Sequence, residues 1–184
     1  DIAVLTGLGI PGAGDLTTFK FYVNDFDTTT SGFDLVATYG AEMFNGNTEF
    51  TFVFSDVENE VDRTKNGLVG GTFIQRLEES LPKQRWNLSA VHLNGDWRVL
   101  ARINSIDGFW TESSGMIDGM ATVDLELARD FGMYNVTLGA QNAFDEYPDE
   151  EVQGLKDAIG MVYPEAAPLG FNGAFYYVKL GVNF

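Results

Sequence analysis

Apolar and polar side chains alternate one for one along much of this chain, and that period of two constrains the fold more than any other feature. The C-terminal residues give the clearest case, with alternate positions that are all apolar or aromatic: Tyr176, Val178, Leu180, Val182 and Phe184. Successive side chains of a β-strand point to opposite faces, so the pattern predicts strands with one apolar face. No apolar run approaches the roughly 18 residues of a membrane-spanning helix. We therefore expect an all-β, antiparallel fold.

The alternation marks about seven strands. The first is predicted as one long strand that keeps its parity from Phe19 to Tyr39, across a stretch that is polar on both faces. Two strands joined by a tight loop would share that parity, so this alternative stays open. The other six are predicted at residues 50–55, 85–92, 97–104, 121–127, 134–140 and 172–184.

The connections between these strands alternate between short and long. The short ones are residues 44–47, 94–96 and 130–133. The first of them contains the Asn45-Gly46 pair, which favours a hairpin turn. The long ones are residues 56–83, 108–118 and 145–171. Short turns on one side and long loops on the other are typical of an outer-membrane β-barrel and not of a soluble β-sandwich.

Two of the long connections carry helix signals. Thr72 and Gln75 form a capping box at the start of residues 73–80, which predicts a short helix there. Asp149 is expected to cap a second helix over residues 150–159.

The alternation also separates the charged side chains from the apolar ones. Lys179 on a lipid-facing surface would cost roughly 2–4 kcal/mol at the membrane midplane, so we expect it on the interior face. The same parity predicts four charged side chains in the lumen of a barrel: Arg98, Arg102, Glu126 and Lys179. Aromatic residues fall near both strand ends, as they do at membrane–water interfaces. Those at the tight turns are Trp97, Tyr134, Tyr39 and Phe184, and those toward the long loops are Trp86, Phe144 and Tyr176.

Composition excludes several classes of function. The formal net charge is -16, from 27 acidic and 11 basic residues, and this argues against a nucleic-acid partner because phosphate recognition needs clustered Lys and Arg. The chain has no Cys, and His92 is its only His, so a transition-metal site or a nucleophile–base pair is poorly supplied. We expect no enzymatic activity, no catalytic residue, no metal and no cofactor.

Three further patterns have simple explanations. Residues 1–16 are rich in glycine and are predicted to be irregular, and residues 7–12 within them match G-x-G-x-x-G without the following helix that a dinucleotide site needs. Acidic clusters at residues 56–62 and 145–151 offer carboxylates for Ca²⁺, but neither has the EF-hand pattern, so we interpret both as solvated loops. The chain begins with Asp1 and shows no signal peptide, so we expect a mature, truncated or cleaved product.

Five segments resemble, in order, motifs of the TonB-dependent outer-membrane receptors. Residues 142–148, Asn-Ala-Phe-Asp-Glu-Tyr-Pro, are similar to the Asn-x-Phe-Asp-x-x-Pro motif near the end of these receptors. Residues 170–177, Gly-Phe-Asn-Gly-Ala-Phe-Tyr-Tyr, resemble the Gly-x-x-Gly-Arg-x-Tyr-Tyr segment that opens their final strand, with Ala174 in place of Arg. The other three segments are residues 24–38, 81–88 and 97–110. The resemblance covers nearly the whole chain.

This resemblance implies that residues 1–184 are the C-terminal third of a plugged barrel of about 22 strands in the outer membrane of a Gram-negative bacterium. The function it implies is active import of a scarce ligand, such as a ferric siderophore, a cobalamin or an oligosaccharide, with energy delivered by TonB. The implied partners are outer-membrane lipid, the plug domain and remaining barrel strands, the TonB complex and the small-molecule ligand. The final strand resembles the assembly signal of outer-membrane barrels, carried by Tyr176, Val178, Leu180, Val182 and Phe184.

Ligand contacts are expected in the long loops. Phe109, Trp110 and Glu112 lie in one such loop and are the candidate ligand-binding residues, while the lumen charges are expected to contact the plug or to line a ligand path. Two alternatives remain. A small self-contained barrel, acting as a passive pore or adhesin, would need an eighth strand from residues 1–16. A soluble β-sandwich would need a second layer over the apolar face.

Overall fold

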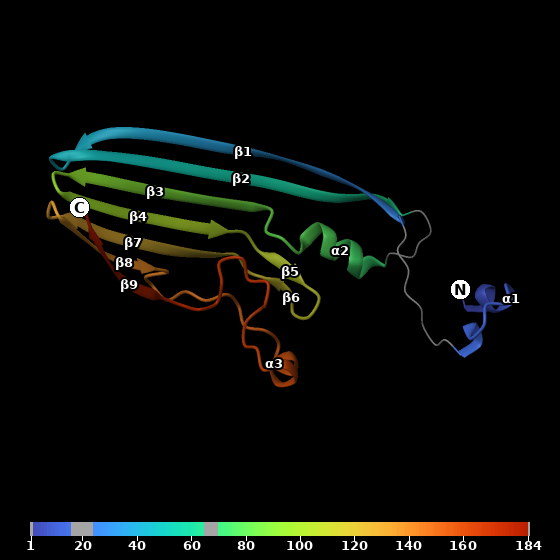
Figure 1. Cartoon of the computed structure of the whole chain (residues 1–184). Coiled ribbons are helices and arrows are strands. Elements are labelled where there is room, and N and C mark those ends of the chain that lie inside the picture. The colour runs from blue at the N-terminus through green and yellow to red at the C-terminus, as the bar shows by residue number, and fades with distance from the viewer. Residues whose placement is uncertain (1, 16–23, 65–69, 184) are drawn as a thin grey trace.

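A seven-stranded antiparallel sheet, in the order β1-β2-β3-β4-β7-β8-β9, dominates the structure (Figure 1). The structure is a computed structural model that describes residues 2–15, 24–64 and 70–183. The strands are β1 (Phe26–Met43), β2 (Gly46–Thr64), β3 (Gln84–Asn94), β4 (Trp97–Ile106), β7 (Met120–Asp130), β8 (Tyr134–Gln141) and β9 (Phe175–Val182). The prediction of an all-β, antiparallel chain with seven main strands is confirmed. Phe19 and Phe184, which the prediction included in strands, lie outside the described residues.

The remaining elements lie in the connections between strands or near the N-terminus. They are β5 (Phe109–Thr111) and β6 (Gly115–Ile117), which pair with each other, and the helices α1 (Ile2–Gly7), η1 (Ala13–Asp15), α2 (Gly71–Glu79) and α3 (Gln153–Ile159). Figure 1 shows α2, α3 and the β5–β6 hairpin at one end of the sheet and the tight turns at the other end. The two ends of the sheet therefore differ, as the alternation of short and long connections predicts.

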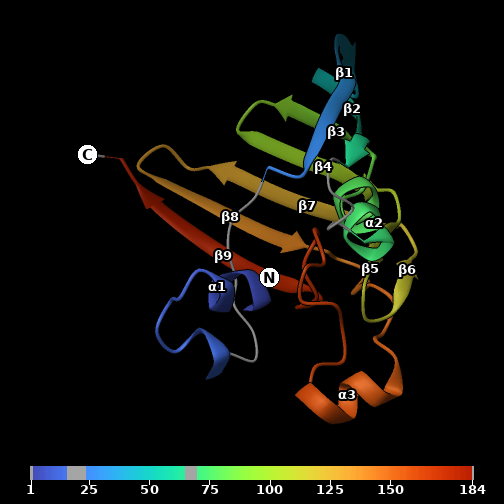
Figure 2. The same cartoon turned by 90° about the vertical axis from the view of Figure 1, so that its right-hand side faces the viewer.

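The sheet is a single curved layer (Figure 2). Among the described elements, the backbone of each strand lies close only to its neighbours in the sheet, apart from β2, whose backbone also lies close to α2. Glu78 of α2 accepts a hydrogen bond from the backbone N–H of Val61 at 2.8 Å, and Phe73 of α2 meets Phe26 of β1 edge-on. β1 and β9 are not paired with each other, so the described sheet is open at both edges and is not a closed barrel.

Strand register places the alternating apolar residues on one common face. One complete row of directly paired residues crosses all seven strands: Tyr39, Phe50, Ala90, Ala101, Leu125, Ala140 and Tyr176. The adjacent row on the opposite face is Gly40, Glu49, Val91, Leu100, Glu126, Gly139 and Tyr177. A slip of one residue in any pairing would exchange the two faces, so the apolar pattern and the register agree. We call the two faces the apolar face and the polar face.

The first hairpin turns one position earlier than the Asn45-Gly46 pair suggests. Phe44 and Asn45 are the two turn residues, with φ of 50° and 58°, and Gly46 already belongs to β2. Two positive φ values are the geometry of a type I′ turn, which matches the twist of the flanking strands. Gly46 is required for another reason, because a Cβ there would lie 2.1 Å from the carbonyl oxygen of Leu93 on β3.

Several local predictions are wrong in detail. β2 continues to Thr64, so residues 56–64 are strand and not loop. Helix α2 begins at Gly71 and has Gly70 as its N-cap, so the predicted Thr72 capping box does not form. Helix α3 begins at Gln153, and Asp149 does not cap it, because its carboxylate instead accepts a hydrogen bond from the N–H of Asp118 at 2.9 Å.

The N-terminal residues are also more ordered than predicted. Ile2–Gly7 forms the short helix α1, where the sequence predicted irregular structure. The predicted single long strand from Phe19 to Tyr39 is confirmed from Phe26 onward, since β1 begins there and runs past Tyr39 to Met43 without a break. It is wrong at Asn24 and Asp25, which are not strand, and residues 19–23 lie outside the described residues.

Candidate functional site

Glu126 of β7 is the centre of a charged network on the polar face. Its carboxylate forms an ion pair with Arg98 of β4, accepts a hydrogen bond from the Tyr177 hydroxyl at 3.0 Å, and lies 3.6 Å from the Nζ atom of Lys179. Lys179 in turn lies over the Tyr177 ring, 4.5 Å from its centre. The network joins three strands that are not all adjacent, because β8 lies between β7 and β9. Three of the four predicted interior charges are therefore brought together.

Gly139 is the reason that this network can cross β8. It lies between Glu126 and Tyr177 in the same row, and a Cβ on it would lie 2.1 Å from Cζ of the Tyr177 ring. Only the absence of a side chain lets the ring pass over the strand and reach Glu126. The alternation of apolar and polar residues did not single out this glycine. Its one signal in the sequence is that it occupies a polar-face position in the middle of a strand.

Arg102, the fourth predicted interior charge, lies on the same face of β4 as Arg98 but outside the network. It is paired in register with Asp124 of β7, and its side chain is exposed. Within the described part of the chain its guanidinium makes no ion pair or hydrogen bond. A free guanidinium beside a polar wall is available to a ligand or to another part of the protein.

Residues 142–147 form a junction between three strands at the loop end. Asn142 exchanges two side-chain hydrogen bonds with the backbone of Glu146, and the N–H of Asn142 donates to Asp124 of β7 at 3.0 Å. The Asp145 carboxylate accepts hydrogen bonds from the N–H of Ala174 at 2.8 Å and from the Tyr147 hydroxyl at 3.1 Å. Asn142 and Asp145 both have positive φ, a backbone conformation that Asn and Asp tolerate better than most residues.

This junction gives the Asn-x-Phe-Asp segment a structural role, since it fixes the chain that leads into β9. The hydrogen bond to Asp145 also raises the pKa of the Tyr147 hydroxyl above its ordinary value, because ionising the phenol would remove the donated proton beside a carboxylate.

A polar cavity of about 370 Å³ opens on the polar face beside this junction. Its lining comes from β4, β7, the end of β8 and the segment that enters β9: Asn104, Thr122, Asp124, Gln141, Asn142, Leu169, Gly170, Asn172, Gly173 and Phe175. Asp124 is held from two sides, by the Asn104 amide at 3.0 Å and by the N–H of Asn142. The lining contains one carboxylate and neither Lys nor Arg.

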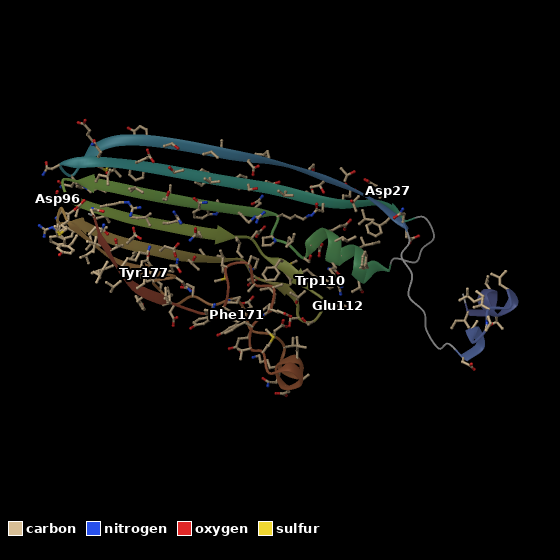
Figure 3. The ribbon with its side chains drawn as sticks, in the orientation of Figure 1. Asp27, Asp96, Trp110, Glu112, Phe171 and Tyr177 are labelled. Carbon is tan, nitrogen blue, oxygen red and sulfur yellow. The ribbon has the colours of Figure 1, made fainter. Side chains whose placement is uncertain are left out.

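The predicted ligand-binding loop residues lie on the β5–β6 hairpin and differ in exposure. Phe109 is only 2% exposed and is paired with Ile117, which is equally buried, so its ring forms the core of the hairpin. Trp110 is partly exposed, and Glu112 forms an ion pair with Arg76 of α2. Figure 3 shows Trp110 and Glu112 together at the loop end, far along the sheet from Asp96 in the β3–β4 turn. The structure thus presents Trp110 and Glu112 to solvent but not Phe109.

At the tight-turn end, aromatic and basic side chains gather on the apolar face. The Arg129 guanidinium lies 4.8 Å from the ring centres of both Trp97 and Phe131, a double cation–π contact. His92 lies with its Nδ1 atom 2.8 Å from the hydroxyl of Thr48 and meets the ring of Phe44 edge-on. Trp97, Arg129 and His92 each combine an apolar body with a polar tip, which is the property of residues at a membrane–water interface.

The described part of the predicted assembly signal lies on one face of β9. Tyr176, Val178, Leu180 and Val182 project onto the apolar face, and Leu180 is 77% exposed. No described element covers them. Phe184, the last residue of the predicted signal, lies outside the described residues.

No protein-family model matches the chain, and no curated protein matches it. No helix in residues 2–15, 24–64 and 70–183 is both long and apolar enough to cross a membrane. Within the same residues, no group of three or more His, Asp or Glu side chains is arranged to hold a metal ion. In the first acidic cluster, Asp56, Glu58 and Asp62 are each hydrogen-bonded by a neighbouring side chain: Gln84, Lys83 and Thr29 respectively.

Proposed function

We propose that this chain forms part of the wall of an outer-membrane β-barrel that imports a scarce ligand with energy supplied through TonB. The observation that carries the proposal is the uncovered apolar face. It extends across all seven strands, and no described element packs on it. An exposed apolar surface of this extent is unstable in water and marks a surface meant for lipid or for another protein.

The chemistry at the two ends of the sheet favours lipid as the cover. Trp97, Phe131 and Arg129 lie together at the tight-turn end, and aromatic residues including Tyr176 and Phe144 lie toward the long-loop end. Aromatic bands at both ends of an apolar belt are typical of outer-membrane strands. A second protein layer would not require such bands.

The opposite face supports a wet interior. Arg98 and Lys179 lie against Glu126 on this face, and Arg102 makes no ion pair or hydrogen bond with any residue that the structure describes. Charged side chains of this kind are costly against hydrocarbon but stable in a water-filled lumen or against a polar plug.

The choice of an importer rests on the five segments that resemble TonB-dependent receptors. A small self-contained barrel has less support, because the described residues supply no eighth strand and Ile2–Gly7 is helical. Seven strands with two open edges are explained more simply as part of a larger wall, since barrels leave no free edge in lipid.

Single cysteines along β4 test the wall directly, since residues 1–184 contain none and any cysteine elsewhere in the complete protein is first replaced by serine. In the complete natural protein in outer membranes, Val99→Cys and Ala101→Cys should react only with a lipid-soluble maleimide. Leu100→Cys and Arg102→Cys should react with a water-soluble maleimide. All four should react equally after unfolding in detergent, which controls for reagent access. Labelling that does not alternate with the strand would refute a lipid-facing wall.

The import step has its own test. The complete natural protein should bind the purified periplasmic domain of TonB, measured by surface plasmon resonance. A protein that shows alternating labelling but no TonB binding would be a barrel of another kind, and the importer proposal would then be wrong.

A further inference from the structure

We infer that the cavity beside the Asn142 junction is a subsite for a neutral oligosaccharide. This inference names the ligand class of the proposed importer and so rests on that proposed function. It comes from two features that lie next to each other: a stack of exposed aromatic rings and a polar cavity with unused amides.

The aromatic stack lies in the segment between β8 and β9. The rings of Tyr147 and Tyr163 are stacked with centres 5.2 Å apart, and Tyr163 and Phe171 are stacked with centres 6.5 Å apart. Tyr147 is 41% exposed and Phe171 is 36% exposed, so the stack is not the core of a folded unit. Aromatic faces that remain open to solvent after stacking are available for a flat apolar surface.

The stack adjoins residues that line the cavity, although none of its three ring residues is itself a lining residue. Phe171 lies between Gly170 and Asn172, which both line the cavity. The Tyr147 hydroxyl lies against Gly173, another lining residue, where a Cβ would come within 2.2 Å of it. A ligand that extends out of the cavity past Gly173 would therefore meet the Tyr147 side chain.

The ring series continues from the cavity onto the polar face. Phe175 lines the cavity and stacks on Tyr177, with centres 6.0 Å apart. Figure 3 labels Phe171 in the loop that leads into β9 and Tyr177 within β9. Aromatic surface thus runs from the loop end toward the Glu126 network, in the direction that an imported ligand would take.

The polar groups of the cavity suit hydroxyl groups. The side-chain amides of Gln141 and Asn172 are exposed and make no hydrogen bond within the described part of the chain. Each can donate and accept, as a sugar hydroxyl does. Asp124 is fixed by Asn104 and by the N–H of Asn142, so an acceptor is already oriented before a ligand arrives.

Charge disfavours the main competing class of ligand. The residues that line the cavity include one carboxylate and no Lys or Arg, and Arg102, which is paired in register with the lining residue Asp124, is not among them. An anionic chelate or a phosphate would meet Asp124 without compensation. A purely apolar ligand would leave the free amides of Gln141 and Asn172 unpaired, which is unfavourable. A pyranose has an apolar C–H face for the rings and a hydroxyl rim for the amides, so it satisfies both halves of the site.

The test is a ligand panel on the complete natural protein in detergent. Isothermal titration calorimetry with maltohexaose, cellohexaose and chitohexaose should detect binding of at least one. Oligogalacturonate, ferrichrome and cyanocobalamin serve as an anionic, a hydroxamate and a corrinoid comparator. For the oligosaccharide that binds, Phe171→Ala and Asn172→Ala should each weaken the affinity by roughly tenfold. Phe171→Tyr should retain binding, because it keeps the ring.

Phe144→Ala is the matched control. Phe144 is a 66% exposed aromatic residue of the same segment that neither lines the cavity nor belongs to the stack of Tyr147, Tyr163 and Phe171, so its loss should leave the affinity unchanged. Heat-modifiable migration on gels verifies that each variant is folded. The inference is wrong if no neutral oligosaccharide binds, or if Phe171→Ala binds as tightly as the natural protein. Either result can occur while the cysteine pattern of β4 still alternates, so the two proposals fail separately.

Discussion

Replacing Gly139 by alanine should break the three-strand network at Glu126. The new Cβ would lie 2.1 Å from Cζ and 2.4 Å from the hydroxyl oxygen of Tyr177, well inside van der Waals contact. The Tyr177 ring must then rotate away and lose its 3.0 Å hydrogen bond to the Glu126 carboxylate. A hydrogen bond to a charged group contributes about 1.5–3 kcal/mol, and partial exposure of this network favours the lower end.

Gly40→Ala is the control for this substitution. Gly40 lies in the same row of the polar face, and a Cβ there would have no atom within 4 Å. Alanine in place of a strand glycine restricts the unfolded chain and should stabilise the protein by about 0.5 kcal/mol. The two variants should therefore differ by about 2 kcal/mol in the free energy of unfolding.

The assay is urea unfolding of the complete natural protein in lipid vesicles, followed by tryptophan fluorescence. In a Tyr177→Ala background the Gly139→Ala substitution should have almost no further effect, because the ring that it displaces is gone. Equal stabilities of Gly139→Ala and Gly40→Ala, or strict additivity with Tyr177→Ala, would show that the ring does not need the glycine.

Three further predictions concern the apolar face and the junction. Leu180→Lys should destabilise the protein in lipid by about 2–4 kcal/mol, the cost of a Lys near the membrane midplane, while Leu180→Phe should be nearly neutral. Unfolding in lipid vesicles measures both variants, and equal destabilisation by the two would contradict a lipid contact at this position. Asp145→Ala should lower the free energy of unfolding by about 1 kcal/mol and speed proteolysis of the loop before β9, because the N–H of Ala174 loses its acceptor. Asp145→Asn keeps an oxygen that can accept from this N–H, so it should behave like the natural protein. The raised pKa of Tyr147 means that its neutral form is favoured in the folded state. The stabilisation from its hydrogen bond to Asp145 is therefore fully present below the ordinary tyrosine pKa of 10.0, and it is lost as the pH rises through the pKa of Tyr147 in the folded protein. Tyrosinate absorbance should show one fewer late-titrating group in Asp145→Ala, and an unchanged titration would contradict the assignment.

The sheet could be predicted from the sequence because the alternation that specifies each strand lies within that strand. In segments such as residues 97–104 every second residue is apolar, and burial of one face fixes the register. The predicted strands failed where this contrast disappears. Residues 56–64 contain only two apolar residues, Val57 and Val61, and they are strand because they pair with residues 26–33 of β1, where Thr29 and Thr30 also donate hydrogen bonds to Asp62 and Asn59. Such pairing depends on a partner strand and not on periodicity.

The candidate site was harder to predict because it depends on contacts between distant residues. Parity places Glu126 and Tyr177 on one face, but 51 positions separate them in the chain, and their contact also needs Gly139 between them. The capping predictions failed for a similar reason. Asp149 would cap a helix that began at Glu150, but α3 begins at Gln153, and the backbone N–H of Asp118 in another loop donates to the Asp149 carboxylate.

The unequal strand lengths have a consequence for the cell surface. β1 and β2 contain 18 and 19 residues, whereas β8 and β9 contain 8 each. At about 3.3 Å per residue the first hairpin extends for roughly 60 Å, which exceeds a hydrocarbon layer of about 30 Å even when the strands are tilted. In the proposed orientation the ends of β1 and β2 form a two-stranded ribbon beyond the membrane. An antibody against residues 57–62 should therefore stain intact bacteria.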